Sequence, residues 1–135
     1  MIADIDGALR AYIEAAQGLP YEWGKSDCTS WAAAWVERVH GRKVKRPRWK
    51  SQDEAHALIA RRGSLLALWS DVLEEFGLQP GYGDPQPGDV GLIETRLAGV
   101  VGGIFIQHGL FCWRGEPYGT RPMMIRSYKA FWSIR

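Results

Sequence analysis

Residues that carry catalytic or ligand-binding chemistry are scarce in this sequence. It has two cysteines, Cys28 and Cys112, and three histidines, and these do not have the spacing of a zinc site. No glycine-rich loop precedes a helix, as a phosphate-binding loop requires. The sequence therefore predicts no metal and no cofactor.

Long apolar segments and a strong net charge are also lacking. The longest uncharged run, residues 97–113, is broken by glycines, a Gln and a His, so no membrane span is expected. The first residues do not form a charged segment followed by an apolar one, which predicts no cleavable signal. We expect a soluble protein with both cysteines as free thiols. A formal net charge of +2 is too small to indicate specific nucleic-acid binding.

The residues that are abundant predict a packed globular protein. Hydrophobic residues make up 46% of the chain, which includes seven tryptophans. A length of 135 residues is enough to bury a core without disulfides or metals. Because no repeat or long linker divides the chain, we expect one domain over residues 1–135.

Apolar spacing predicts helices in the first half of the chain and strands in the second. Helical stripes with caps and glycine stops lie at residues 2–16, 28–39, 51–62 and 64–76. Runs of β-forming residues follow at 89–95, 100–107, 110–114 and 123–128, with a closing segment at 131–134. His108-Gly109 is the predicted turn between two of these strands. This order predicts an α+β fold in which N-terminal helices pack on one face of a C-terminal antiparallel sheet.

A basic stretch follows the second predicted helix. It runs from Arg38 to Lys50 and contains no acidic residue. One interpretation is a solvated loop, and the other is a surface for an anionic partner such as a cell-wall polymer, a phosphate backbone or an acidic protein face. The basic residues are Arg38, Arg42, Lys43, Lys45, Arg46, Arg48 and Lys50.

Cys28 is the main candidate for reactive chemistry because it lies at the start of a predicted helix. Ser26 and Asp27 before it are good helix caps, and the positive end of the helix dipole favours a thiolate. A cysteine nucleophile also needs a base and a group that orients the base. The alternative is a structural cysteine, since free Cys often behaves as a small buried apolar residue.

Three short motifs stand out: Tyr21-Glu22-Trp23-Gly24 and Asp27-Cys28-Thr29 at this cysteine, and Pro87-Gly88-Asp89-Val90 at the first predicted strand. They resemble motifs of the NlpC-type cell-wall peptidases of the papain-like superfamily. More closely, the chain is similar to a compact branch of this superfamily from phage tail gene clusters. That branch shares a basic loop ending in an aromatic residue, here Trp49, the helix around Ala55 and a terminal segment like residues 130–134. The resemblance runs from Tyr21 to the C-terminus and implies a papain-like fold of the NlpC type.

The resemblance also implies roles for individual residues. Cys28 takes the position of the nucleophile, and Tyr21 takes that of a hydroxyl that donates to the developing oxyanion. Active members have a His at the head of the second strand, where this sequence has Val101. The residue that orients the base falls near Trp113, and neither side chain can replace its counterpart.

Other histidines are the possible substitutes for the missing base. His108 is the nearest along the chain, but a straight strand places it roughly 20 Å beyond Val101. We interpret His56 as an exposed helix residue and His40 as a capping residue.

Three functions are consistent with these observations. The first is a structural or adaptor protein of a phage tail tip, in the baseplate or hub, with a degenerate peptidase site. The second is an active cysteine amidase or endopeptidase that cleaves peptidoglycan stem peptides during phage DNA entry. The third is an anion-binding module that uses residues 38–50. The resemblance implies synthesis in the host cytoplasm, a final place in the virion, and other tail-tip proteins as partners, with peptidoglycan peptide as a further ligand.

Overall fold

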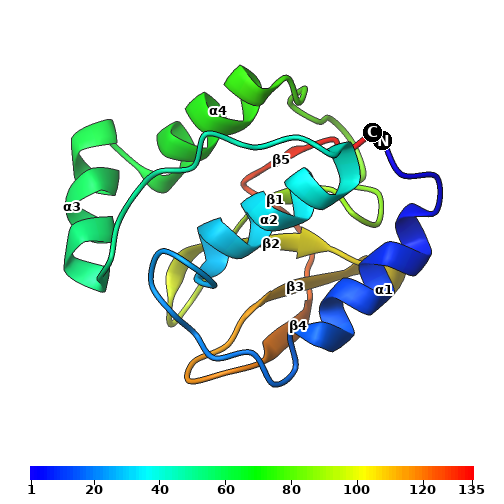
Figure 1. Cartoon of the computed structure of the whole chain (residues 1–135), viewed down its shortest axis with the longest axis horizontal. Coiled ribbons are helices and arrows are strands. Elements are labelled where there is room, and N and C mark those ends of the chain that lie inside the picture. The colour runs from blue at the N-terminus through cyan, green and yellow to red at the C-terminus, as the bar shows by residue number, and fades with distance from the viewer.

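The computed structural model describes all residues from 1 to 135 and has four α-helices followed by a five-stranded antiparallel sheet (Figure 1). The predicted α+β class and the order of helices before strands are confirmed. The helices are α1 (Ile5–Ala15), α2 (Cys28–His40), α3 (Gln52–Arg62) and α4 (Leu65–Phe76). The strands are β1 (Val90–Thr95), β2 (Gly99–Phe105), β3 (Leu110–Arg114), β4 (Thr120–Met124) and β5 (Ala130–Trp132).

Helix limits follow the capping signals in the sequence. Ser51 and Ser64 each accept a hydrogen bond from the backbone N–H three residues later, at the N-termini of α3 and α4. At the other end of a helix, Gly41 and Gly77 adopt the left-handed conformation that closes α2 and α4. The predicted helices therefore agree with the observed ones to within a few residues.

The strands lie in the order β4-β3-β2-β1-β5. A 3₁₀ turn at Gln107–Gly109 joins β2 to β3, as the His108-Gly109 pair predicted. One strand prediction was wrong in its limits: β4 spans Thr120–Met124 rather than 123–128. Pro122 lies within β4, which is an edge strand, where a residue without an N–H is tolerated.

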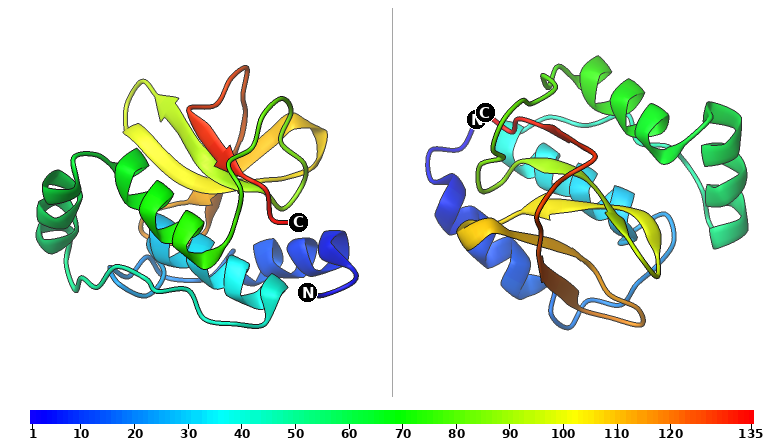
Figure 2. Two further views of the ribbon diagram at one scale, coloured as in Figure 1. Left: turned by 90° about the horizontal axis from the view of Figure 1, so that it is seen from above. Right: turned by 180° about the vertical axis from the view of Figure 1, so that it is seen from behind.

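All four helices lie on one side of the sheet, with α3 beyond its end (Figure 2, left). The main core lies between the helices and the sheet, and Trp35, Val36 and Val39 of α2 are fully buried in it. From the sheet, Leu92 and Ile104 contribute to the same cluster. A smaller cluster covers the opposite face of the sheet and contains Ile93, Phe105, Phe111 and Phe131. The end of the sheet near the start of α2 carries the candidate site.

Candidate functional site

The loop before Cys28 is held by the buried carboxylate of Asp27. Asp27 is 1% exposed and caps α2 by accepting the backbone N–H of Ser30 at 3.0 Å and its hydroxyl at 2.9 Å. It also accepts the Gly24 N–H at 2.6 Å and the indole N–H of Trp49 at 3.0 Å. These four hydrogen bonds satisfy the carboxylate without a cation and fix the place of Cys28 at the first position of α2.

Arg114, at the end of β3, supports the same loop from the sheet. Its side chain is buried, and its five N–H groups donate to five backbone carbonyls at 2.5–3.2 Å. No carboxylate takes part in this network. The acceptors belong to the end of α1, to the following loop and to the β3–β4 turn, so one side chain joins three segments. They are the carbonyl oxygens of Ala16, Leu19, Pro20, Ser26 and Gly119.

The Cys28 thiol is not activated in this environment. The residue keeps some exposed surface, but protein atoms surround the thiol, and this burial raises its pKa to about 11. Hydrogen bonding from the Arg114 backbone and the Tyr21 hydroxyl, together with the charge of Arg114, lowers the pKa only in part, and Asp27 opposes them. The net shift of the Cys28 pKa is therefore opposite to the one expected from a helix N-terminus alone, because desolvation is the largest effect.

Tyr21 lies next to Cys28, as the sequence motif predicted. Its hydroxyl is 4.0 Å from the Cys28 sulfur, and burial raises the pKa of the phenol, so it remains a donor. Tyr21 also packs edge-on against Trp23, with ring centroids 5.3 Å apart. The hydrogen bond from the Tyr21 hydroxyl is the only side-chain hydrogen bond of Cys28. The role of this hydroxyl as a donor to an oxyanion stays a prediction.

Cys28 borders a cavity of about 400 Å³. Its walls come from the start of α2, from α3 and the start of α4, from the β1–β2 hairpin and from the segment joining β3 to β4. Exposed polar side chains lie at its rim, among them His56 of α3. The lining residues are Tyr21, Trp23, Asp27, Cys28, Thr29, Trp49, Gln52, His56, Ile59, Leu65, Ala98, Val100, Val101, Gly102, Trp113, Arg114, Glu116 and Arg121.

The positions expected for a base and its orienting residue both border this cavity. However, the side chains of Val101 and Trp113 pack in the cluster on the sheet face away from the helices. Side chains alternate along a strand, so the neighbouring Gly102 is the one that faces the helices. A Cβ at Gly102 would overlap the indole of Trp69, which donates to the Thr29 hydroxyl at 3.0 Å. An aromatic ring of α4 thus fills the space where a strand residue would reach Cys28.

The structure does not bring His108 to Cys28. His108 lies in the turn after β2, whereas the Cys28 cavity is at the opposite end of that strand. It borders a different cavity, and the two cavities share no lining residue. The distance along β2 from Val101 to His108, which the sequence already indicated, explains why His108 and Cys28 lie apart.

His56 is the residue that sequence reasoning missed. It is exposed, as expected, but α3 places it at the Cys28 cavity, edge-on to Trp23 with ring centroids 6.2 Å apart. It makes no hydrogen bond with Cys28. No sequence signal predicts its position, because the packing of α3 depends on tertiary contacts. His40, in contrast, bonds the carbonyl of Ile134 at 2.8 Å near the end of α2.

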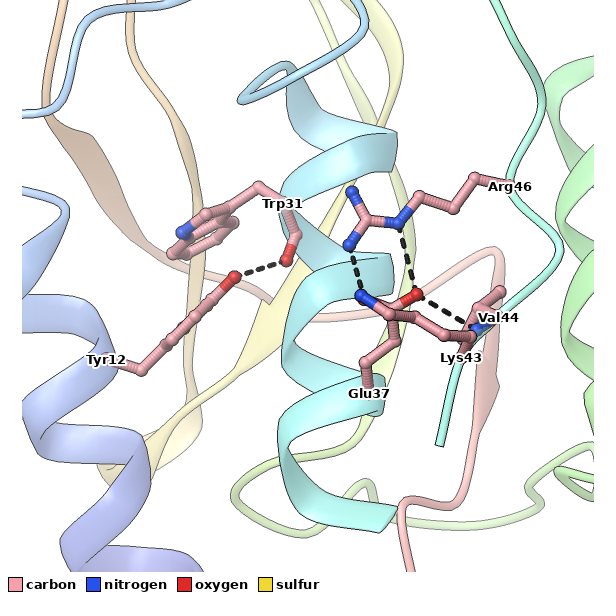
Figure 3. A network of polar contacts seen from close by, with 6 residues as sticks. All are labelled: Tyr12, Trp31, Glu37, Lys43, Val44 and Arg46. Atoms are coloured by element: carbon pink, nitrogen blue, oxygen red, sulfur yellow. Dashed lines mark hydrogen bonds and ion pairs between the residues drawn. The ribbon is translucent and has the colours of Figure 1, made fainter. Parts of the chain in front are cut away.

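Acidic residues from outside the basic stretch partly neutralise it. Glu37 of α2 accepts from Arg46 at 2.5 and 3.3 Å and from the Val44 N–H at 2.9 Å (Figure 3). Burial alone would raise the pKa of Glu37, but these hydrogen bonds and the charges of Arg46 and Lys43 outweigh it and lower the pKa. Lys45 pairs with Glu75 at 3.3 Å. The local positive potential is therefore smaller than the sequence indicated.

Four basic residues of the stretch, Arg38, Arg42, Arg48 and Lys50, take part in no ion pair. Arg42 donates to the Phe76 carbonyl at 2.6 Å, and its guanidinium stacks 3.7 Å from the centre of the Phe76 ring.

No three His, Cys, Asp or Glu side chains come together as a metal site would require. None of the helices combines the length and the apolar character needed to cross a membrane.

Comparison with known proteins gives one result. Residues 1–134 match a family described as a domain of unknown function, DUF6950. No curated protein matches the sequence.

Proposed function

We propose that this chain, which belongs to the DUF6950 family, is a structural or adaptor protein of a phage tail tip with a papain-like fold of the NlpC type and no hydrolytic activity. The motifs around Tyr21, Cys28 and Asp89 and their order along the chain support the assignment to a tail-tip branch of that superfamily. A cysteine at the start of a helix that packs on an antiparallel sheet is consistent with the fold.

One observation carries the loss of hydrolysis. The β2 residue that lies on the helix side of the sheet at the Cys28 cavity is Gly102, and Trp69 fills the space beside it. A general base must lie within hydrogen-bond reach of the thiol, directly or through one water. The side chain that hydrogen-bonds the thiol directly is the Tyr21 hydroxyl, and a thiol with a pKa of about 11 remains protonated at neutral pH.

The decisive experiment is an assay of peptide release from purified cell walls. We expect no release by the wild type above the level of Cys28→Ala, because both proteins lack an activated nucleophile. His56→Ala and His108→Ala separate the two histidines that could act as a base after a rearrangement. Release that depends on Cys28 and on either histidine would overturn the proposal and favour the amidase or endopeptidase.

The thiol itself provides an independent measurement. The rate of alkylation of Cys28 should rise with pH up to about 11, well above the ordinary thiol value of about 8.5. Cys28→Ala supplies the blank, so that reaction of Cys112 is subtracted. A midpoint below 8 would show a thiolate at neutral pH and contradict the proposal.

The place in the tail tip needs a separate test. We expect the protein to copurify with assembled tails of the phage that encodes it, and Cys28→Ala to leave assembly intact. Failure to find it in particles would contradict the structural role.

A further inference from the structure

The segment that joins α2 to α3 crosses the molecule as an extended chain (Figure 1). Residues 43–49 belong to no helix or strand, and the side chains of Val44 and Trp49 are buried and pack in the core. Side chains alternate along an extended chain, so the basic residues on either side of these two are directed to the surface. We call these four exposed residues the basic strip. They are Lys43, Lys45, Arg48 and Lys50.

The donors of the basic strip are available to a ligand. Arg48 and Lys50 take part in no ion pair. Lys43 and Lys45 each reach one carboxylate, but their side chains are 92% and 86% exposed. Ion pairs that are so exposed contribute little to stability, so another anion can replace the partner at little cost.

A cavity of about 900 Å³ lies along the basic strip. All four strip residues line it, together with Arg46 and the carboxylates of Glu37 and Glu54. Both carboxylates already have partners in the protein. Glu37 accepts from Arg46, and Glu54 accepts the Lys50 N–H at 3.2 Å and the Ser51 hydroxyl at 3.4 Å. The lining therefore has an excess of positive charge, which attracts anions to the cavity.

The positive charge is arranged as a line and not as a broad face. Strip residues that are two positions apart lie roughly 7 Å from each other on an extended chain, and the segment from Lys43 to Lys50 spans up to roughly 23 Å. Carboxylates border the line, with Glu75 paired to Lys45 and Glu54 beside Lys50. A narrow line of cations fits one linear polyanion, whereas a duplex presents the charges of two strands.

The apolar residues of the lining indicate which polyanion fits. Trp49 is its one aromatic residue, and this ring is buried with its N–H bonded to Asp27. The bases of a single-stranded nucleic acid would therefore find no ring on which to stack. Val44 is buried and Pro47 is half-buried, so the strip also lacks the exposed apolar anchor of a protein interface. A phosphodiester chain without bases matches this surface, because its charges alone supply the attraction.

We propose that the basic strip binds an anionic polymer of the polyol phosphate class, whose phosphates contact the side chains of Lys43, Lys45, Arg48 and Lys50. The inference goes beyond the proposed function and does not depend on it. The cavity along the strip and the Cys28 cavity share Trp49 alone among their lining residues. Hydrolysis at Cys28, or absence of the protein from tails, would therefore leave this inference standing.

The test is an NMR titration of the full chain with an oligomer of glycerol phosphate, at salt concentrations from about 20 to about 200 mM. We expect the amide resonances of the basic strip to shift. The logarithm of the binding constant should fall against the logarithm of the salt concentration with a slope of about −3, as four contacts to a single chain predict. No shift at the lowest salt concentration, or binding that salt does not weaken, overturns the inference.

Two other polyanions of equal charge distinguish the kind of ligand. A single-stranded oligonucleotide should bind no more tightly than the glycerol phosphate oligomer, because its bases find no exposed aromatic ring. Polyglutamate should bind more weakly, because the ordering of its flexible side chains costs free energy. Tighter binding of the oligonucleotide would assign the strip to nucleic acid, and tighter binding of polyglutamate would assign it to an acidic protein. Either result overturns the proposed ligand.

Paired variants test the place of binding. Arg48→Gln combined with Lys50→Gln removes two exposed cations that make no ion pair, so the fold should be retained. Half of the contacts are lost, so the salt slope should halve and binding should weaken about 20-fold at about 0.1 M salt.

The matched control is Arg10→Gln combined with Arg96→Gln. It removes the same charge from α1 and from the β1–β2 hairpin, where both arginines are exposed and take part in no ion pair. Charges outside the strip are screened by salt, so this variant should keep the slope and bind within about twofold of the wild type. Equal affinities of the strip variant and the control overturn the assignment to the basic strip.

Discussion

The network beneath Cys28 and the ion pairs around Glu37 use the same kinds of charged side chains in different surroundings. Arg114 and Asp27 are 4% and 1% exposed, and every polar group on them has a protein partner. Around Glu37, the cations are more exposed than Arg114: the side chain of Lys43 is 92% exposed and that of Arg46 is 29% exposed. Water can replace a lost partner at the surface but not in the core, so loss of a buried partner has the larger cost.

The candidate site shows a second contrast, between the residues that hold its loop in place and the residues that would carry out a reaction. The capping carboxylate and the arginine that hold the loop are present and fully bonded. Val101 stands where the resemblance places a base, and a Cβ at the neighbouring Gly102 would overlap the indole of Trp69. On the proposed function, this buried framework positions Cys28 for a structural role and not for hydrolysis.

The largest expected effect comes from Arg114→Met. It leaves five backbone carbonyls without their donor in a region that water does not reach. We expect the free energy of unfolding to fall by about 4 kcal/mol, measured by urea denaturation. Arg114→Lys is the matched control: it keeps the charge but has three donors instead of five, so it should lose less. Equal stability of the methionine variant would contradict the role of Arg114 in joining three segments.

A smaller effect is expected for Asp27→Asn. The amide keeps one acceptor oxygen and turns an NH₂ group toward donors from Gly24, Ser30 and Trp49, so stability should fall by about 2 kcal/mol. Asp4→Asn makes the same change at the N-cap of α1, where the side chain is exposed and accepts from Gly7 alone. Because Asn is a good N-cap, the Asp4 variant should change stability by less than about 0.5 kcal/mol. Similar losses of stability in the Asp27 and Asp4 variants would contradict the larger cost expected at the buried site.

The sequence predicted the parts of the fold that depend on local signals. Capping residues such as Ser51 and Ser64, and the turn at His108-Gly109, fix helix limits and a hairpin through neighbours in the chain. The start of α2 at Cys28 was predicted in the same way from Asp27.

The features that the sequence did not predict depend on residues far apart along the chain. The cluster of donors around Asp27 includes Trp49, and the acceptors of Arg114 lie up to 98 positions away. A shift of one residue along β2 separates Val101, on the outer face, from Gly102, which faces the helices. Strand register is set by tertiary packing, so a motif alignment alone could not choose between them.

The smallest expected loss of stability is that of Glu37→Gln. Its dependence on pH tests the contrast between buried and exposed charges. Glu37→Gln removes the charge that accepts from Arg46, and we expect a loss of about 1 kcal/mol at pH 7. Because the pKa of Glu37 is lowered from its ordinary value of 4.5, its contribution is present above that value and is lost as the pH falls through the lower pKa of the folded state. Thermal unfolding of wild type and variant should therefore differ at pH 7 and converge in acid.

Lys45→Ala is the control for this pair. The side chains of Lys45 and Glu75 are 86% and 61% exposed, so their ion pair should contribute less than about 0.5 kcal/mol at any pH. A difference between Glu37→Gln and wild type that stayed constant down to pH 3 would show that packing, and not charge, accounts for the contribution of Glu37. A cost for Lys45→Ala as large as that of Glu37→Gln would mean that exposure does not rank these interactions, and the contrast with Arg114 would lose its physical basis.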